Sequence, residues 1–218
     1  MTRQQYAVIG MGRFGSSVAK QLYDAGQEVM GIDIEEKQVE DAELFITHGA
    51  VADTTVKATL KSLGIRNVDC VIVAIGSNMQ ASILTVLLLK EIGIKKVIAK
   101  ALNEQHGQVL EKVGADWIVY PDKDMGERVA HQLLSPNVIN FIELSKEYSI
   151  EEINIPENMV GKSLRELDIR ANYNVSVIAV MSHGDILISP SSTQTIHKGD
   201  ILIVIGKKQD LSALTKEE

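Results

Sequence analysis

A glycine-rich turn near the start of the chain restricts the fold more than any other feature. The apolar run Tyr6–Ile9 leads into Gly10, Gly12 and Gly15, spaced as G-x-G-x-x-G, and a helical pattern begins at once. The first glycine allows a tight exit from a strand, the second lets backbone N–H groups approach a phosphate, and the third lets the helix pack close to the sheet. Strand, turn and helix together predict a nucleotide-binding Rossmann unit, with phosphates at the helix N-terminus.

Asp33 follows the next predicted strand, Glu28–Ile32, at the distance that such a unit requires. An acid at roughly 20 residues past the glycines hydrogen-bonds ribose hydroxyls, and it also disfavours a 2′-phosphate and hence NADP. The alternative is that Asp33 caps the following helix, whose first turn contains Glu35 and Glu36. We favour the ribose role, because the strand, the glycines and the acid agree.

Apolar, β-branched runs alternate with helical segments up to residue 120, and we count six strands there. This alternation predicts an α/β fold with a Rossmann-type doubly wound parallel sheet, in the strand order 3-2-1-4-5-6. Ligands bind at the carboxyl ends of strands 1 and 4 in such a sheet, so Gly10–Gly15 and Gly76–Asn78 should face one another. Asp53, Thr54 and Thr55 are expected to cap a helix that runs to Leu63.

The pattern changes after the helix predicted from Pro121 to Leu134. Ser135, Pro136 and Asn137 interrupt it, and an amphipathic piece, Val138–Leu144, follows. Two helices separated by Ser-Pro would form a crossover arm exchanged between subunits, and a simple surface linker is an equal alternative. We place the domain boundary here, with domains 1–144 and 145–218. The second is expected to be a small α+β domain with hairpins, whose thin core favours dimerisation.

Composition excludes several classes of protein. The 218 residues carry a net charge of −7, which argues against nucleic-acid binding because phosphate contacts need a basic face. Cys70 lies in an apolar run, as a reduced core thiol does, and no metal-binding Cys/His spacing occurs. The longest apolar stretch, Ile83–Leu89, is far shorter than the roughly 20 residues that span a bilayer. We therefore expect a cytoplasmic protein.

Four segments and the C-terminal part resemble the RCK (KTN) family: Ala7–Gly15, Ile72–Gly76, Lys112–Asp116 and Pro121–Gly126. Within that family the chain is similar to KtrA/KtrC-type, TrkA-like regulatory subunits of bacterial potassium uptake channels. The resemblance implies an RCK-N domain that binds ATP or ADP, and can bind NAD(H), followed by an RCK-C domain. It also implies dimers that assemble into a ring of eight. That ring lies on the inner face of the membrane, under a KtrB/KtrD-type potassium channel subunit that nucleotide exchange gates.

The resemblance also implies roles for single residues. Arg13 matches the residue that reaches the γ-phosphate of ATP in the neighbouring subunit. Without the resemblance, Arg13 is a cation at a helix N-terminus, and the helix dipole disfavours a cation there unless an anion is near. Asp122 matches a position that holds a divalent cation, Mg²⁺ or Ca²⁺, or is a helix-capping Asp. Lys100, at the end of the fifth strand, is either a phosphate contact or an ordinary exposed lysine. The predicted nucleotide site comprises Gly10, Gly12, Arg13, Phe14, Gly15, Asp33, Ile34, Asp53, Ala74, Ile75, Gly76 and Lys100.

A second ligand site is implied in the RCK-C domain, where two domains of this family bind cyclic di-AMP between them. Arg170 offers a fork for phosphate, His183 and Asn174 can bond phosphate or base edges, and Ile169 with Pro190 would sandwich an adenine. Without the resemblance, His183 is a turn residue before Gly184, and the apolar pair is core or edge packing. The predicted site comprises Ile169, Arg170, Ala171, Asn174, His183 and Pro190.

Two functions from different classes compete. The first is a non-enzymatic, nucleotide-sensing gating subunit, and the second is an NAD-dependent oxidoreductase. A dehydrogenase needs a proton donor beside the nicotinamide. The sequence has no Tyr-x-x-x-Lys pair, its five histidines are at surface-like positions, and the C-terminal domain is small for enclosing a substrate. A transcription regulator is disfavoured because no basic helix-turn-helix segment occurs. We therefore favour the gating subunit.

Overall fold

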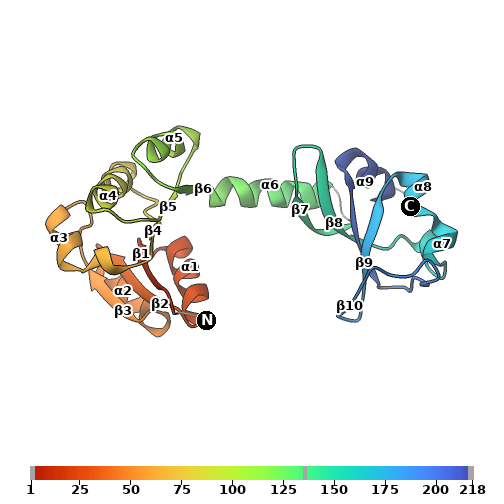
Figure 1. Ribbon diagram of the computed structural model, residues 1–218, viewed down its shortest axis with the longest axis horizontal. Helices are drawn as coiled ribbons and strands as arrows, with labels where there is room; N and C mark the ends of the chain where they lie inside the picture. Colours follow the sequence, from red (N-terminus) through yellow and green to blue (C-terminus); the bar gives the residue numbers. More distant parts are fainter. Residues whose placement is uncertain (1–2, 135–136, 216–218) are drawn as a thin grey trace. The chain divides into compact units, whose positions relative to one another are not determined.

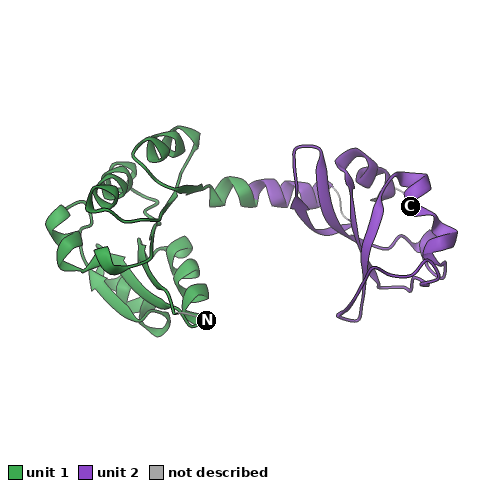
Figure 2. Cartoon of the chain, in the orientation of Figure 1, with its two compact units in different colours: residues 1–125 green, residues 126–218 purple. Residues whose placement is uncertain are grey.

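The computed structural model describes residues 3–134 and 137–215, and the contacts within it divide the chain into two compact units (Figure 2). They comprise residues 1–125 and residues 126–218. The interruption predicted at Ser135 and Pro136 lies outside the described residues.

The first unit is built on a six-stranded, entirely parallel sheet. Its strands are β1 (Gln5–Ile9), β2 (Glu28–Asp33), β3 (His48–Val51), β4 (Cys70–Val73), β5 (Val97–Lys100) and β6 (Trp117–Val119). Its helices are α1 (Arg13–Asp24), α2 (Glu36–Ala42), α3 (Lys57–Ser62), α4 (Met79–Ile92) and α5 (Glu104–Lys112), with short 3-10 turns η1 (Glu43–Phe45) and η2 (Ile65–Asn67). The strand order is β3-β2-β1-β4-β5-β6, which confirms the predicted doubly wound topology.

Helices cover both faces of this sheet (Figure 1). Successive side chains of a strand point to opposite faces, so Val8 packs with one core and its neighbours Ala7 and Ile9 pack with the other. Helices α1 and α2 supply Ala19 and Ala42 to the first core, and α3, α4 and α5 supply the leucines of the second. Because both faces are buried, the strands can be apolar throughout, as the sequence is.

The second unit contains a five-stranded antiparallel sheet in the order β10-β9-β11-β8-β7. Its strands are β7 (Val138–Glu143), β8 (Tyr148–Asn154), β9 (Ser176–Ser182), β10 (Asp185–Ile188) and β11 (Ile201–Lys207). Its helices are α7 (Leu164–Leu167), α8 (Ile169–Tyr173) and α9 (Lys208–Thr215), with the 3-10 turn η3 (Glu157–Met159). Helix α6 (Pro121–Leu134) contributes residues to both units. The small α+β domain is therefore confirmed.

The prediction of a second helix in a crossover arm is wrong for Val138–Glu143, which forms strand β7. This strand pairs antiparallel with β8, where Phe141 faces Glu151 and Ile142 faces Ile150. The apolar residues of so short a run fit the spacing of a helix as well as that of a strand. The hydrogen bonds that make it a strand come from a separate part of the chain. The same pairing places residues 138–143 in the second unit, which begins at residue 126, whereas the predicted boundary falls between 144 and 145.

Within the described ranges, none of the helices combines the length and the apolar character that crossing a bilayer requires.

Candidate functional site

The first unit contains a cavity of about 590 Å³ that gathers the predicted nucleotide residues. It opens where β1, β2, β4 and β5 end, which is the edge at which doubly wound sheets bind ligands. Every predicted nucleotide residue except Gly15 lines it: Gly10, Gly12, Arg13, Phe14, Asp33, Ile34, Asp53, Ala74, Ile75, Gly76 and Lys100. Segments from distant parts of the chain thus converge as the topology predicts.

The three glycines of the turn have different surroundings. Gly10 has φ of 94°, and a Cβ there would lie 2.9 Å from the carbonyl carbon of Ala74. A Cβ on Gly15 would lie 1.8 Å from the carbonyl oxygen of Gly10, so Gly15 is needed for the approach of α1 to the strand end. Gly12, by contrast, has no atom within 4 Å of its Cβ position and lines the cavity. Protein packing leaves room there for a ligand to meet the backbone.

Asp33 ties the glycine turn to the second strand. Its Oδ2 accepts a hydrogen bond of 2.6 Å from the Met11 N–H, and its Oδ1 accepts one of 3.0 Å from the Glu35 N–H. The helix-capping alternative is not observed, because the N-cap residue of α2 is Glu35 and it has no side-chain cap. A carboxylate has about four acceptor sites, so two donors leave capacity for ribose hydroxyls in the cavity.

Asp53 lines the same cavity as Asp33 and comes two residues after β3. Its Oδ1 accepts hydrogen bonds from the Thr55 hydroxyl and the Thr55 N–H, and these lower the pKa of Asp53. The expected helix cap is therefore wrong: Asp53 closes a local turn, and α3 begins later with Val56 as its N-cap residue. The turn keeps the Asp53 carboxylate ionised and fixed against the backbone.

Two cationic side chains reach the same cavity. Arg13 is exposed in the first turn of α1, whereas the side chain of Lys100 is only 15% exposed. The Lys100 Nζ lies 5.7 Å from the centroid of the Phe14 ring and 3.7 Å from the Oδ2 of Asp122. Asp122 is in the first turn of α6, and its side chain is 83% exposed. Lys100 is thus a partly buried cation inside the cavity, not an ordinary exposed lysine.

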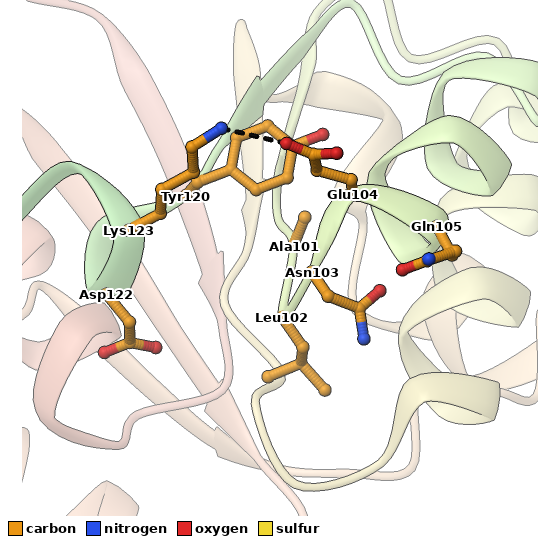
Figure 3. A pocket seen from close by; sticks show the side chains of 8 residues that line it. All are labelled: Ala101, Leu102, Asn103, Glu104, Gln105, Tyr120, Asp122 and Lys123. Atoms are coloured by element: carbon orange, nitrogen blue, oxygen red, sulfur yellow. Dashed lines mark hydrogen bonds and ion pairs between the residues drawn. The ribbon is translucent and has the colours of Figure 1, made fainter. Parts of the chain in front are cut away.

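A smaller cavity of about 310 Å³ adjoins the first at α5 (Figure 3). Residues 101–105, Tyr120, Asp122 and Lys123 line it, and Lys123 pairs with Glu104 at 2.9 Å. Leu102 and Asp122 line both cavities. Leu102, Glu35 and Gln38 also line the larger cavity and were not predicted. Leu102 and Glu35 come just after strand ends, which was a usable signal, whereas Gln38 lies within α2.

His106 contradicts the prediction that all histidines are at surface-like positions. His106 lies in α5 and is only 1% exposed. Its backbone N–H donates a hydrogen bond to the side-chain oxygen of Asn103, which caps the helix. Its ring Nδ1 accepts a 3.3 Å hydrogen bond from the backbone N–H of Leu102. Its Nε2 has no hydrogen-bond partner in the described part of the chain. Burial lowers the pKa of His106, so the ring is held neutral.

The predicted cyclic di-AMP residues fall into two places in the second unit. Arg170 and Ala171 are exposed on α8, and Asn174 ends that helix and donates a 3.1 Å hydrogen bond to Asp210. Pro190 follows β10 at the same end of β9, because the Ser189 N–H donates to the Ile178 carbonyl. His183 stands in the two-residue turn beyond the other end of β9, as the turn alternative predicted.

Ile169 is buried, with only 4% of its surface exposed, and packs in the core of the second unit. This placement matches the alternative interpretation of Ile169 as a packing residue. None of the six residues lines either cavity described above.

These observations define a class: a Rossmann-type nucleotide-binding unit joined to a small antiparallel unit. Residues 6–121 match the TrkA-N domain model and residues 150–217 match the TrkA-C domain model. The chain is 46% identical to Ktr system potassium uptake protein C of Bacillus subtilis, over 98% of this chain and 97% of that protein. The chain belongs to this family of Ktr and TrkA potassium uptake proteins, which confirms the resemblance seen in the sequence.

Solved structures agree on the fold. The GsuK RCK domain superposes with a TM-score of 0.67 at 18% identity, covering 99% of this chain and 48% of that chain. The GsuK channel bound to NAD superposes with a TM-score of 0.54 at 24% identity, covering 98% of this chain and 38% of that one. This chain therefore spans about half or less of those solved chains, and they establish the RCK fold.

Proposed function

We propose that this chain is a non-enzymatic, nucleotide-sensing gating subunit of a potassium transport system. One observation carries the proposal. The glycine turn, the Asp33 carboxylate and the cationic side chains of Arg13 and Lys100 all line one cavity. In this proposal, Asp33 and Asp53 receive the ribose. The phosphates lie at the N-terminus of α1 beside Lys100, and Arg13 of a neighbouring subunit completes the site at the γ-phosphate. ATP and ADP differ by one phosphate at that position, so a site with two cations can distinguish them.

An NAD-dependent oxidoreductase is the competing function, and the lining of the cavity argues against it. Among the described residues that line it, none is a histidine, tyrosine or cysteine, and the hydroxyls that it does contain, on Thr54, Thr55 and Ser77, are not side chains that usually act as general acids. NAD(H) can still bind as a signal, since a related channel was solved with NAD. We therefore propose ATP and ADP as the principal ligands and NAD(H) as a further one.

A divalent cation does not fit the described residues well. Mg²⁺ and Ca²⁺ need several oxygen ligands, and the predicted ligand Asp122 faces the ammonium group of Lys100. No group of three or more acidic, histidine or cysteine side chains that could hold a metal occurs in residues 3–134 or 137–215.

The second proposed site takes cyclic di-AMP between two copies of the second unit. Arg170, Asn174 and Pro190 lie at one end of β9 and His183 lies at the other. The seven residues of β9 separate Asn174 from His183 by roughly 20 Å. One copy therefore cannot bring all of them to one ligand, whereas a second copy can supply His183 across an interface. Ile169 would support Arg170 from the core and not stack on an adenine.

Transport provides the test of the gating role. Vesicles that contain a KtrB/KtrD-type membrane subunit are loaded with this chain, and rubidium uptake is compared in ATP and in ADP. We expect uptake to differ at least severalfold between the two nucleotides and to lose that difference with Gly12→Val, which fills the space at the turn. Equal uptake with and without the chain would contradict the proposal.

A further inference from the structure

We propose that Ser16 is a positioning residue for the glycine turn, because its hydroxyl group fixes the direction of the peptide group between Met11 and Gly12. This inference rests on the proposed function and adds to it a residue that does not itself line the cavity. Ser16 lies in α1 directly after Gly15. Its hydroxyl donates a hydrogen bond of 2.6 Å to the Met11 carbonyl oxygen.

Met11 is held by both its backbone and its side chain. Its N–H donates a hydrogen bond of 2.6 Å to the Oδ2 of Asp33, and its carbonyl accepts the one from Ser16. The Met11 side chain is only 1% exposed, and its terminal methyl carbon lies 3.2 Å from the Cβ position of Gly31 in β2. Side chains from α1 and from the end of β2 thus fix the residue that precedes Gly12.

The planar peptide group passes this constraint on to Gly12. The peptide between Met11 and Gly12 is trans, so the carbonyl of the first residue and the N–H of the second point in opposite directions. Since the Met11 carbonyl points to Ser16, the Gly12 N–H points away from it. Gly12 lines the cavity, and none of the described residues accepts a hydrogen bond from its N–H. This donor is therefore available to a phosphate oxygen at the N-terminus of α1.

Removal of the Ser16 hydroxyl would release this peptide group. The hydrogen bond from Ser16 is partly buried, and a carbonyl that loses its partner in such a place must turn toward water or stay unsatisfied. The Gly12 N–H turns with the carbonyl, and a donor that points away from its acceptor makes a weaker hydrogen bond. Asp33 cannot replace Ser16, because the Met11 N–H belongs to the preceding peptide group.

Calorimetry on Ser16→Ala tests the inference. We expect this variant to bind both ATP and ADP about three- to tenfold more weakly than the wild type, which corresponds to one hydrogen bond. Ser16→Thr keeps a hydroxyl group and should bind both nucleotides within about twofold of the wild type. Ser17→Ala is the matched control, because Ser17 is the next residue of α1 and is exposed. Its affinity for both nucleotides should equal that of the wild type.

Hydrogen exchange supplies a readout that a purely structural role would not change. Saturating ADP should slow exchange of the amides at residues 12 and 13 in the wild type and in Ser17→Ala, because phosphate oxygens accept their hydrogens. Ser16→Ala should show less of this protection at the same occupancy.

Wild-type affinity or full protection in Ser16→Ala would overturn the inference, and so would a Ser16→Thr that binds as weakly as Ser16→Ala. Each of these results leaves the proposed function standing. Failure of the wild-type chain to bind either nucleotide would overturn the proposed function itself, which is a separate result.

Discussion

Gly12 and Gly15 lie three residues apart in one turn, yet their substitution by alanine should have opposite consequences. A methyl group at Gly15 would press against the Gly10 carbonyl oxygen, whereas one at Gly12 would meet no atom within 4 Å. We expect Gly15→Ala to lower the free energy of unfolding by about 3 kcal/mol or more, because two backbone segments would have to separate. Gly12→Ala should leave the stability within about 0.5 kcal/mol of the wild type and weaken ATP binding at least tenfold.

Chemical denaturation and calorimetry on the two variants separate these effects, and each variant is the control of the other. A stable Gly15→Ala would show that the sheet and helix tolerate a wider separation. A Gly12→Ala that binds ATP normally would contradict the placement of phosphate at this turn.

The buried His106 in helix α5 should make the stability of the first unit depend on pH in mild acid. The usual pKa of His106, 6.5, is lowered by burial, so below that value the unfolded chain binds a proton that the folded chain does not. Stability should therefore fall as the pH drops from about 7 to 5.5, by up to about 1.4 kcal/mol per pH unit. The protonated ring would also lose the hydrogen bond that Nδ1 accepts from Leu102, a residue of both cavities.

Urea denaturation of His106→Gln over the same pH range checks this. The variant should be less stable than the wild type at pH 7 but should show a flatter dependence on pH, whereas the exposed-histidine control His48→Gln should keep the wild-type slope. Equal slopes in His106→Gln and the wild type would contradict a neutral buried ring.

The elements of the first unit could be predicted because each is specified by neighbouring residues. Asn78 and Asn103 cap their helices, Gly93 ends α4 in the left-handed region, and apolar runs mark the strands. Elements that depend on distant partners could not be predicted in this way: β7 is a strand because β8 pairs with it. The residues of the cavity divide in the same way, into those that local sequence specifies and those that depend on distant partners. Its glycines and Asp33 were readable from spacing, but the pairing of Lys100 with Asp122 depends on how β5 and α6 pack.

At the scale of the whole molecule, the second unit has an edge strand that favours association. Strand β10 ends the five-stranded sheet, and Ile186, Leu187 and Ile188 on it are all exposed. An exposed apolar edge strand is a template for pairing with another chain. We expect the purified protein to be an octamer built from dimers by light scattering, and Ile188→Lys to shift it to smaller species. Ile188→Val, which keeps the apolar surface, should retain the octamer; a monomeric wild type would contradict the assembly.

The most direct test of the account is whether this chain distinguishes ATP from ADP through Arg13. Isothermal titration calorimetry on the wild type should give micromolar affinity for both nucleotides. Arg13→Ala should weaken ATP binding by about tenfold or more, which is the loss of one charge-assisted hydrogen bond, and change ADP binding by less than twofold. Equal losses for both nucleotides would reject a γ-phosphate role, and strong binding of NADPH with no heat from ATP or ADP would contradict nucleotide sensing by this chain.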